Sequence, residues 1–135
     1  MAGEKDLQIL IANMEPVLNP GEYVFASVLS TETIPRALTI CEVKEQEGTT
    51  VVLAKKDADQ LDIAYEFVAA WITLNVHSAL EAVGLTAAFS NALANSGISC
   101  NVIAGFYHDH IFVDVADSEK AMEVLQGMTS NSGGL

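Results

Sequence analysis

Basic residues are scarce in this sequence. Its 135 residues include 6 lysines and arginines against 18 aspartates and glutamates, which gives a formal net charge of −12. Within residues 57–135 the single base is Lys120. Nucleic acids and anionic membrane surfaces are bound through cationic footprints, so we expect neither as a partner. An acidic surface that keeps the protein in solution is the simpler reading of this charge.

Cysteines and long apolar runs are also scarce. Cys41 and Cys100 are far apart and form no C-x-x-C motif, which suits small buried side chains in a reducing compartment. The longest mainly apolar run, Phe67–Leu74, is far shorter than the roughly 20 residues that span a bilayer. The opening residues MAGEKDLQIL have acids where a signal peptide needs bases. We therefore expect a cytoplasmic protein that is not anchored in a membrane.

Motifs for common chemistry are missing as well. The sequence has no G-x-G-x-x-G, no P-loop spacing and no G-x-S-x-G nucleophile motif. The close acidic pairs Asp57/Asp59 and Asp117/Glu119 stand where helix caps belong, not across a predicted cleft. We expect no enzyme activity and no cofactor.

Half of the residues are hydrophobic, enough for a core, and their spacing predicts a mixture of helices and strands. Leu7, Leu10, Ile11 and Met14 mark one face of a helix over 4–14. Strand patterns recur between turn signals, with hairpins at 45–48 and near 107–110. We expect strands at 22–29, 38–43, 49–55, 98–106 and 110–116, two strands within 65–78 that divide near Ala69–Ala70, and helices at 85–96 and 117–128.

An internal echo divides the chain into two units. The segment TVVLAKKDADQL (50–61) and the segment HIFVDVADSEKA (110–121) both read as strand, acidic cap and helix. We expect one unit in residues 1–68, a second in 69–128 and a flexible tail in 129–135. The first unit lacks a counterpart of the 85–96 helix, and the N-terminal helix is a candidate to replace it. Chance similarity is the alternative. The fold class that follows is α+β: pseudo-duplicated ferredoxin-like βαββα units, each an antiparallel sheet with helices on one face.

The second half resembles a known regulatory module. The segment GLTAAFSNALANSGISCNVIAG (84–105) has a glycine at the helix start, an apolar i, i+4 stripe, and an asparagine entering the next strand. This pattern is similar to the ACT domain, found in aspartate kinases and other enzymes of amino-acid metabolism. The segments WITLNVHSALEAVGLTA and YHDHIFV are most similar to small stand-alone proteins with two ACT-like units. The resemblance is weak over residues 1–60.

The resemblance implies a ligand site, usually for an amino acid, between a strand-to-helix loop and the sheet edge of a neighbouring unit. Free backbone amides at a helix start can hold a carboxylate where no basic side chain is near. Gly84 would let the backbone approach a ligand without a Cβ. The alternative is that Gly84 and Thr86 only begin a helix. The implied contact positions are His77, Ser78, Gly84, Leu85 and Thr86, with Asn101, Val102 and Ile103 opposite.

The YHDH segment, Tyr107, His108, Asp109 and His110, allows three readings. As a metal site it has two histidines, with Asp109, His77 and two distant cysteines as further candidate ligands, but the spacing matches no standard zinc pattern, so we expect no metal. As a catalytic group it has no nucleophile paired with it in sequence. A hairpin tip at a subunit or ligand interface is the reading that we adopt, with contacts that respond to pH through the histidines.

Two further features have ordinary structural readings. Trp71 belongs in the core of a strand, and a stacking platform for a ligand is the alternative. Lys55–Lys56, the only adjacent basic pair, reads as a solvated strand end.

The sequence thus favours a non-enzymatic protein that binds a small molecule, most simply an amino acid. Binding would change its association or conformation and so regulate a partner enzyme, which the sequence does not name. Exposed sheet edges favour a homo-oligomer. The rival interpretations are a structural or interaction module without a ligand, and an enzyme or metal-binding protein that uses the histidines of YHDH.

Overall fold

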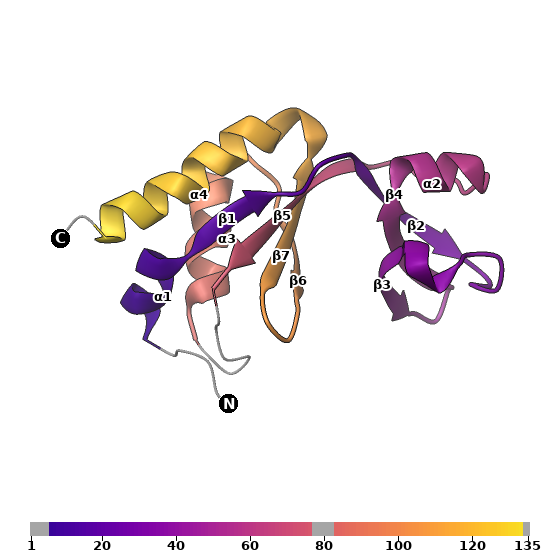
Figure 1. The fold of residues 1–135 in the computed structure, drawn as a ribbon, viewed down its shortest axis with the longest axis horizontal. Helices are drawn as coiled ribbons and strands as arrows, with labels where there is room; N and C mark the ends of the chain where they lie inside the picture. Colours follow the sequence, from indigo (N-terminus) through magenta and orange to yellow (C-terminus); the bar gives the residue numbers. More distant parts are fainter. Residues whose placement is uncertain (1–5, 77–82, 134–135) are drawn as a thin grey trace. The chain divides into compact units, whose positions relative to one another are not determined.

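The computed structural model describes residues 6–76 and 83–133, and the chain divides into two compact units. Unit 1 consists of Met1–Asn19 and Trp71–Leu135, and unit 2 of Pro20–Ala70. In sequence, unit 2 is therefore inserted between two segments of unit 1. Figure 1 labels the elements of both.

Unit 2 is a small antiparallel sheet with one short helix. Its strand order is β3-β4-β2-β5, and every pairing whose register is known is antiparallel. Only the first residues of β5 belong to this unit, where Val24 lies opposite Val68. The elements are β2 (Tyr23–Val28), β3 (Thr39–Lys44), β4 (Thr49–Ala54), α2 (Lys55–Gln60) and β5 (Val68–Asn75).

Alternate residues of the strands in unit 2 form its core, because successive side chains of a strand point to opposite faces. The cluster joins Val24 and Ala26 of β2 to Val51 and Leu53 of β4. The connection between β2 and β3 contains a 3₁₀ turn (Arg36–Leu38), whereas the corresponding connection in unit 1 contains a long helix. This confirms that the first repeat lacks that helix, and Ile34 of the connection is buried in the cluster instead.

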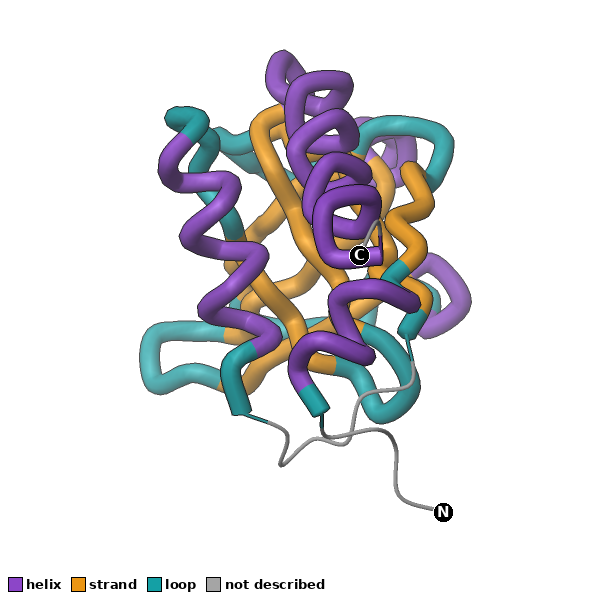
Figure 2. The backbone as a smooth tube through the Cα atoms, turned by 90° about the vertical axis from the view of Figure 1, so that its left-hand side faces the viewer, coloured by secondary structure: helices purple, strands orange, loops and turns teal. Residues whose placement is uncertain are grey.

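Unit 1 is a larger helix-covered sheet with the order β1-β5-β7-β6. Its helices lie on one face of the strands (Figures 1 and 2). Within the described residues, none of the helices has the length and apolar composition that crossing a membrane requires. The elements are α1 (Leu7–Asn13), β1 (Glu15–Leu18), the rest of β5, α3 (Leu85–Asn95), β6 (Asn101–Ala104), β7 (Asp109–Asp114) and α4 (Ser118–Gly133).

The core of unit 1 lies between these helices and the sheet. Its largest fully buried side chains on the helices include Leu10, Phe89, Leu93 and Leu125. The predicted stripes of apolar residues therefore identified the packed faces of α1 and α3. Asp6 caps α1 through its Oδ1, which accepts hydrogen bonds from the backbone N–H of Gln8 at 3.0 Å and of Ile9 at 3.2 Å.

The N-terminal segment, expected in the first repeat, clusters with unit 1. Strand β1 was not predicted; it pairs with β5 so that Pro16 lies opposite Leu74 and Leu18 opposite Ile72. The helix before it packs on α4 and α3. At the end of α1, the Met14 carbonyl accepts a hydrogen bond from the Thr129 hydroxyl of α4 at 3.0 Å.

Two other boundaries differ from the sequence expectation. The segment predicted as two strands dividing near Ala69–Ala70 contains one continuous strand, β5, whose pairing partners change along its length. Helix α4 continues to Gly133, beyond the expected end at Met128. Apart from these differences, the order β3-β4-β2-β5 of unit 2 corresponds strand for strand to β6-β7-β5-β1 of unit 1, where β1 from the start of the chain takes the place that β5 has in unit 2. The predicted pseudo-duplicated ferredoxin-like fold is therefore confirmed.

Candidate functional site

The predicted ligand loop leads into α3 of unit 1. His77 and Ser78 lie outside the described residues. Gly84 precedes α3 with a φ of 100°, a left-handed conformation that side chains other than glycine rarely adopt. A Cβ on Gly84 would lie 3.1 Å from Cδ2 of Leu7 on α1. The glycine is thus required by its backbone conformation and by the packing of α1, independently of any ligand.

The amino end of α3 has backbone donors but no side-chain cap. The Gly84 carbonyl accepts from the Ala88 N–H at 2.9 Å, the first hydrogen bond of the helix. Among the described residues, no acceptor is found for the N–H groups of Leu85, Thr86 and Ala87. Leu85 is buried, whereas Thr86 and Ala87 are exposed. The last two residues therefore bring the positive end of an 11-residue helix to the surface.

The residues predicted to lie opposite form β6, which is the last strand in the order of unit 1. Its Asn101 lies opposite Phe112 of β7, and the Asn101 side chain donates to the Phe112 carbonyl at 3.2 Å. Val102 and Ile103 are half-buried. Asn101 thus has a structural role in the hairpin, and the described residues show no hydrogen bond between β6 and the start of α3.

The YHDH segment is divided between a turn and a strand. The Gly105 N–H donates to the His108 carbonyl at 2.9 Å and closes the hairpin turn, while Asp109 and His110 already belong to β7. The Tyr107 side chain is exposed and meets the Phe106 ring edge-on, with 5.0 Å between ring centroids. The tip of the hairpin therefore has two neighbouring aromatic side chains, whereas Asp109 and His110 lie on the sheet.

His110 belongs to a polar network on the sheet of unit 1. Its Nδ1 accepts from the Trp71 indole N–H at 3.1 Å and lies 3.3 Å from the Thr73 hydroxyl. The Asn19 side-chain amide donates to that hydroxyl at 3.0 Å. The Trp71 ring also stacks on Phe112, with 5.9 Å between ring centroids. Trp71 is half-buried and is not one of the buried core residues, so it lies outside the predicted core position and instead packs on Phe112 and donates to His110.

The environment of this network shifts the pKa values of two groups. Burial lowers the pKa of His110, the positive charge of His108 lowers it further, and Asp109 opposes both. Burial also raises the pKa of Asp109, against the opposing charges of His110 and His108. Both pKa shifts favour the neutral form of the side chain concerned. The imidazole of His110 is therefore uncharged at neutral pH, and its Nδ1 can accept the hydrogen bond from Trp71.

Other reactive groups do not gather into a site. Within residues 6–76 and 83–133, no three histidine, cysteine or acidic side chains are placed to hold a metal ion. Cys41 and Cys100 are free thiols. Burial raises the pKa of the Cys100 thiol, against the smaller effect of its neighbour Ser90, so its reactive thiolate is disfavoured.

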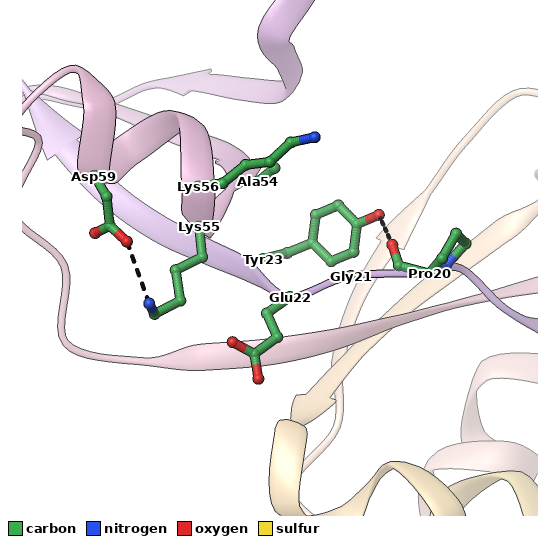
Figure 3. A pocket seen from close by; sticks show the side chains of 8 residues that line it. All are labelled: Pro20, Gly21, Glu22, Tyr23, Ala54, Lys55, Lys56 and Asp59. Atoms are coloured by element: carbon green, nitrogen blue, oxygen red, sulfur yellow. Dashed lines mark hydrogen bonds and ion pairs between the residues drawn. The ribbon is translucent and has the colours of Figure 1, made fainter.

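Unit 2 contains a cavity of about 460 Å³ that the sequence did not suggest. Figure 3 shows its lining, which joins the turn before β2 to the end of β4 and the start of α2. We call it the Tyr23 cavity. Its lining residues are Pro20, Gly21, Glu22, Tyr23, Ala54, Lys55, Lys56 and Asp59.

The Lys55–Lys56 pair, predicted to be a solvated strand end, begins α2 and lines the Tyr23 cavity. The Lys55 ammonium forms an ion pair with Asp59 at 3.2 Å, and the Asp59 carboxylate also accepts from the Tyr65 hydroxyl at 2.7 Å. The hydrogen bonds to Asp59 and Tyr65 raise the pKa of Lys55. Those from Tyr65 and Lys55 lower the pKa of Asp59. Both side chains are therefore charged at neutral pH.

Comparison with protein families gives two adjoining matches. Residues 2–70 match one ACT domain family and residues 66–127 match another. No curated protein matches the chain.

Several solved structures share the architecture. A Vibrio cholerae protein of unknown function, named a possible transport protein, is 44% identical with a TM-score of 0.82, over 93% of this chain and 97% of that one. An Agrobacterium tumefaciens protein is 20% identical with a TM-score of 0.65, over 86% and 89%. The ligand-free regulatory subunit of aspartate kinase from Thermus thermophilus is 10% identical with a TM-score of 0.58, over 84% and 95%. The last two structures are less than 25% identical to this chain, so their similarity indicates a shared fold only.

Proposed function

Because the chain belongs to the ACT domain family over both of its halves, we propose that it is a regulatory protein that binds an amino acid. Binding changes its self-association or its conformation, and that change acts on a partner enzyme. Such coupling requires the ligand to bind one state more tightly than another. The protein performs no chemistry on its ligand in this proposal.

The observation that carries the proposal is the amino end of α3, for which the described residues include no side-chain cap. The backbone amides of the exposed residues Thr86 and Ala87 supply two donors at the positive end of the helix. Within the described part of unit 1, residues 83–133 contain a single base, Lys120 on α4. A ligand carboxylate near α3 would therefore bind backbone amides, and its ammonium group would face an acidic protein. His77, Ser78, Gly84 and Leu85 would contribute from the loop.

The second half of the proposed site is the edge strand β6 of a neighbouring copy, with Asn101, Val102 and Ile103. A strand at the end of a sheet has unpaired backbone groups that can pair with another chain. This arrangement requires a homo-oligomer, so ligand binding and assembly are linked. Sedimentation analysis with and without amino acid measures this link, and a monomer under both conditions would exclude a site shared between copies.

A thermal-shift screen of the twenty amino acids tests ligand binding. A ligand at 100 times its dissociation constant adds about 2.7 kcal/mol to the free energy of unfolding. We expect a rise in Tm with at least one amino acid. No rise with any of the twenty would favour a structural module without a ligand.

A charge placed at the helix start then tests the location. In Thr86→Asp the new carboxylate suits the helix end and should stabilise the free protein by about 0.3–1 kcal/mol, yet it repels a ligand carboxylate. We expect the ligand-induced shift to disappear. Asn91→Asp is the matched control, because Asn91 is an exposed residue in the middle of the same helix. An undiminished shift in Thr86→Asp would move the site away from α3.

A further inference from the structure

The Tyr23 cavity in unit 2 has the features of a separate binding site. Its volume of about 460 Å³ falls within the range of small-molecule sites, about 300–1,000 Å³. Three segments of unit 2 line it, so it depends on the fold of that unit. It shares no residue with the site proposed at α3 and β6.

The walls of the cavity are held in place by local bonds. Pro20 and Gly21 form a bend between β1 and β2, and Gly21 has a positive φ of 96°, which glycine adopts without strain. The Tyr23 hydroxyl donates to the Pro20 carbonyl. The Lys55 N–H donates to the Glu22 carbonyl at 2.9 Å, which ties the turn to the start of α2. The half-buried Tyr23 ring therefore forms a fixed wall, and burial raises the pKa of its hydroxyl.

Two charged groups of the lining remain for a ligand. Lys55 and Asp59 already neutralise each other. For Lys56 and Glu22, the described residues include no ion pair or side-chain hydrogen bond. In the view of Figure 3, the Lys56 chain runs above the Tyr23 ring and the Glu22 side chain below it. The cavity thus presents one available cation and one available anion around an aromatic wall.

From this arrangement we propose that the Tyr23 cavity binds a small zwitterion, with its carboxylate on Lys56, its ammonium group on Glu22 and its carbon chain against the Tyr23 ring. A neutral zwitterion suits the site better than an anion, because the four charged residues of the lining sum to zero and the whole chain has a net charge of −12. The flexible four-carbon stem of Lys56 can adjust to the spacing between the two ligand charges.

Chemical-shift mapping of the ¹⁵N-labelled full chain tests the proposal. The probes are the twenty L-amino acids together with β-alanine, 4-aminobutyrate and 6-aminohexanoate. These last three each have one amine and one carboxylate, and they differ in the number of carbons between the two groups. We expect a saturable shift of the Glu22, Tyr23, Lys55 and Lys56 amides with at least one probe. The N-acetyl and amide derivatives of that probe, which each lack one charge, should bind more weakly.

Matched substitutions show whether the charges of Lys56 and Glu22 contribute to binding. Lys56→Gln should weaken binding of the best probe by about three- to tenfold, the range expected for a charge-assisted contact near the surface. Lys120→Gln makes the same change in charge on the exposed face of α4 and should leave the affinity unaltered. Glu22→Gln should weaken binding similarly, with Glu32→Gln, an exposed residue outside the cavity, as its control.

Several results would overturn this site. One is that no probe causes a saturable shift at the four amides. Another is that Lys56→Gln binds the best probe as tightly as the wild type does. The third is that the two derivatives lacking a charge bind as tightly as the probe itself. The outcome is separable from that of the proposed function. Thr86→Asp should remove binding at α3 only, and Lys56→Gln should weaken binding at the Tyr23 cavity only.

Discussion

Units 1 and 2 have the same strand order but complete their sheets and cores differently. In unit 2, the fourth position is taken by the start of β5, and one helix of six residues lies beside the strands. In unit 1, β1 from the start of the chain takes that position, and three helices cover the sheet. The comparison teaches that a repeat can lose a helix when one buried residue, Ile34, fills the gap, and that a repeat need not be continuous in sequence.

The same comparison separates the two proposed sites. The carboxylate site in unit 1 relies on helix α3, whose counterpart is missing from unit 2. The Tyr23 cavity in unit 2 relies instead on side chains at a turn and a short helix. If both proposals hold, loss of the first helix in a repeat removes one means of binding a carboxylate, and Lys56 provides another.

The largest expected effect tests whether α1 belongs to unit 1 alone. Leu10 is fully buried, so Leu10→Ala should lower the free energy of unfolding by about 2–5 kcal/mol. Hydrogen exchange should accelerate in β1, β5 and α4, with β3 and β4 retaining their protection. Ile9→Ala is the neighbouring control, because Ile9 is 46% exposed and should change stability little. Equal loss of protection in β3 and β4 would mean that α1 supports both units.

A smaller effect sharpens the contact between α1 and the start of α3. Gly84→Ala and Gly97→Ala both place a side chain at positive φ, with a strain of about 1–2 kcal/mol. A Cβ at Gly97 meets open space, whereas a Cβ at Gly84 meets Leu7, so Gly84→Ala should be the more destabilising in chemical denaturation. Adding Leu7→Ala should reduce the extra cost of Gly84→Ala. Additive effects of the two substitutions would contradict the contact.

The smallest expected effect concerns pH and the polar network of unit 1. The pKa of folded His110 lies below its ordinary value of 6.5, so the unfolded chain binds the proton first as the pH falls. This contribution to stability is fully present above pH 6.5 and is lost as the pH falls from 6.5 through the folded pKa. His110→Asn should flatten that decline in urea unfolding at pH 5–8. An unaltered slope would exclude His110 as its source.

Asp109 acts in the opposite direction. Its folded pKa lies above the ordinary 3.8, so its contribution to stability is present below pH 3.8 and is lost as the pH rises through the folded pKa.

Trp71 is the only tryptophan in the chain, and its indole donates to His110. Its fluorescence should therefore report the protonation of His110 before any unfolding occurs.

Elements with local patterns were predictable from the sequence. The helix over 85–96 and the hairpin at 45–48 have periodic apolar residues or turn signals within a few positions, and both are present. Strand β1 has no such local signal. Its four residues include Pro16, and its partner β5 is distant in sequence, so only the tertiary fold defines it.

The candidate sites were predictable only in part. The glycine at the start of α3 was identified, but the position of Leu7, which a Cβ at Gly84 would meet, depends on packing between segments that no local pattern connects. For Lys55–Lys56, the sequence indicated a solvated end. The nearby turn at Pro20–Tyr23 is brought to these lysines by the hydrogen bond from the Lys55 N–H to the Glu22 carbonyl, which leaves no trace in composition or spacing.

The insertion of unit 2 within unit 1 has a consequence for biosynthesis. Unit 2 is continuous in sequence, so its strands can pair as soon as its last residue leaves the ribosome. Helix α1 has its partners on α3 and α4, which are made after unit 2. Its apolar face stays without these partners until then, a period in which a nascent chain is open to chaperones and to misassembly.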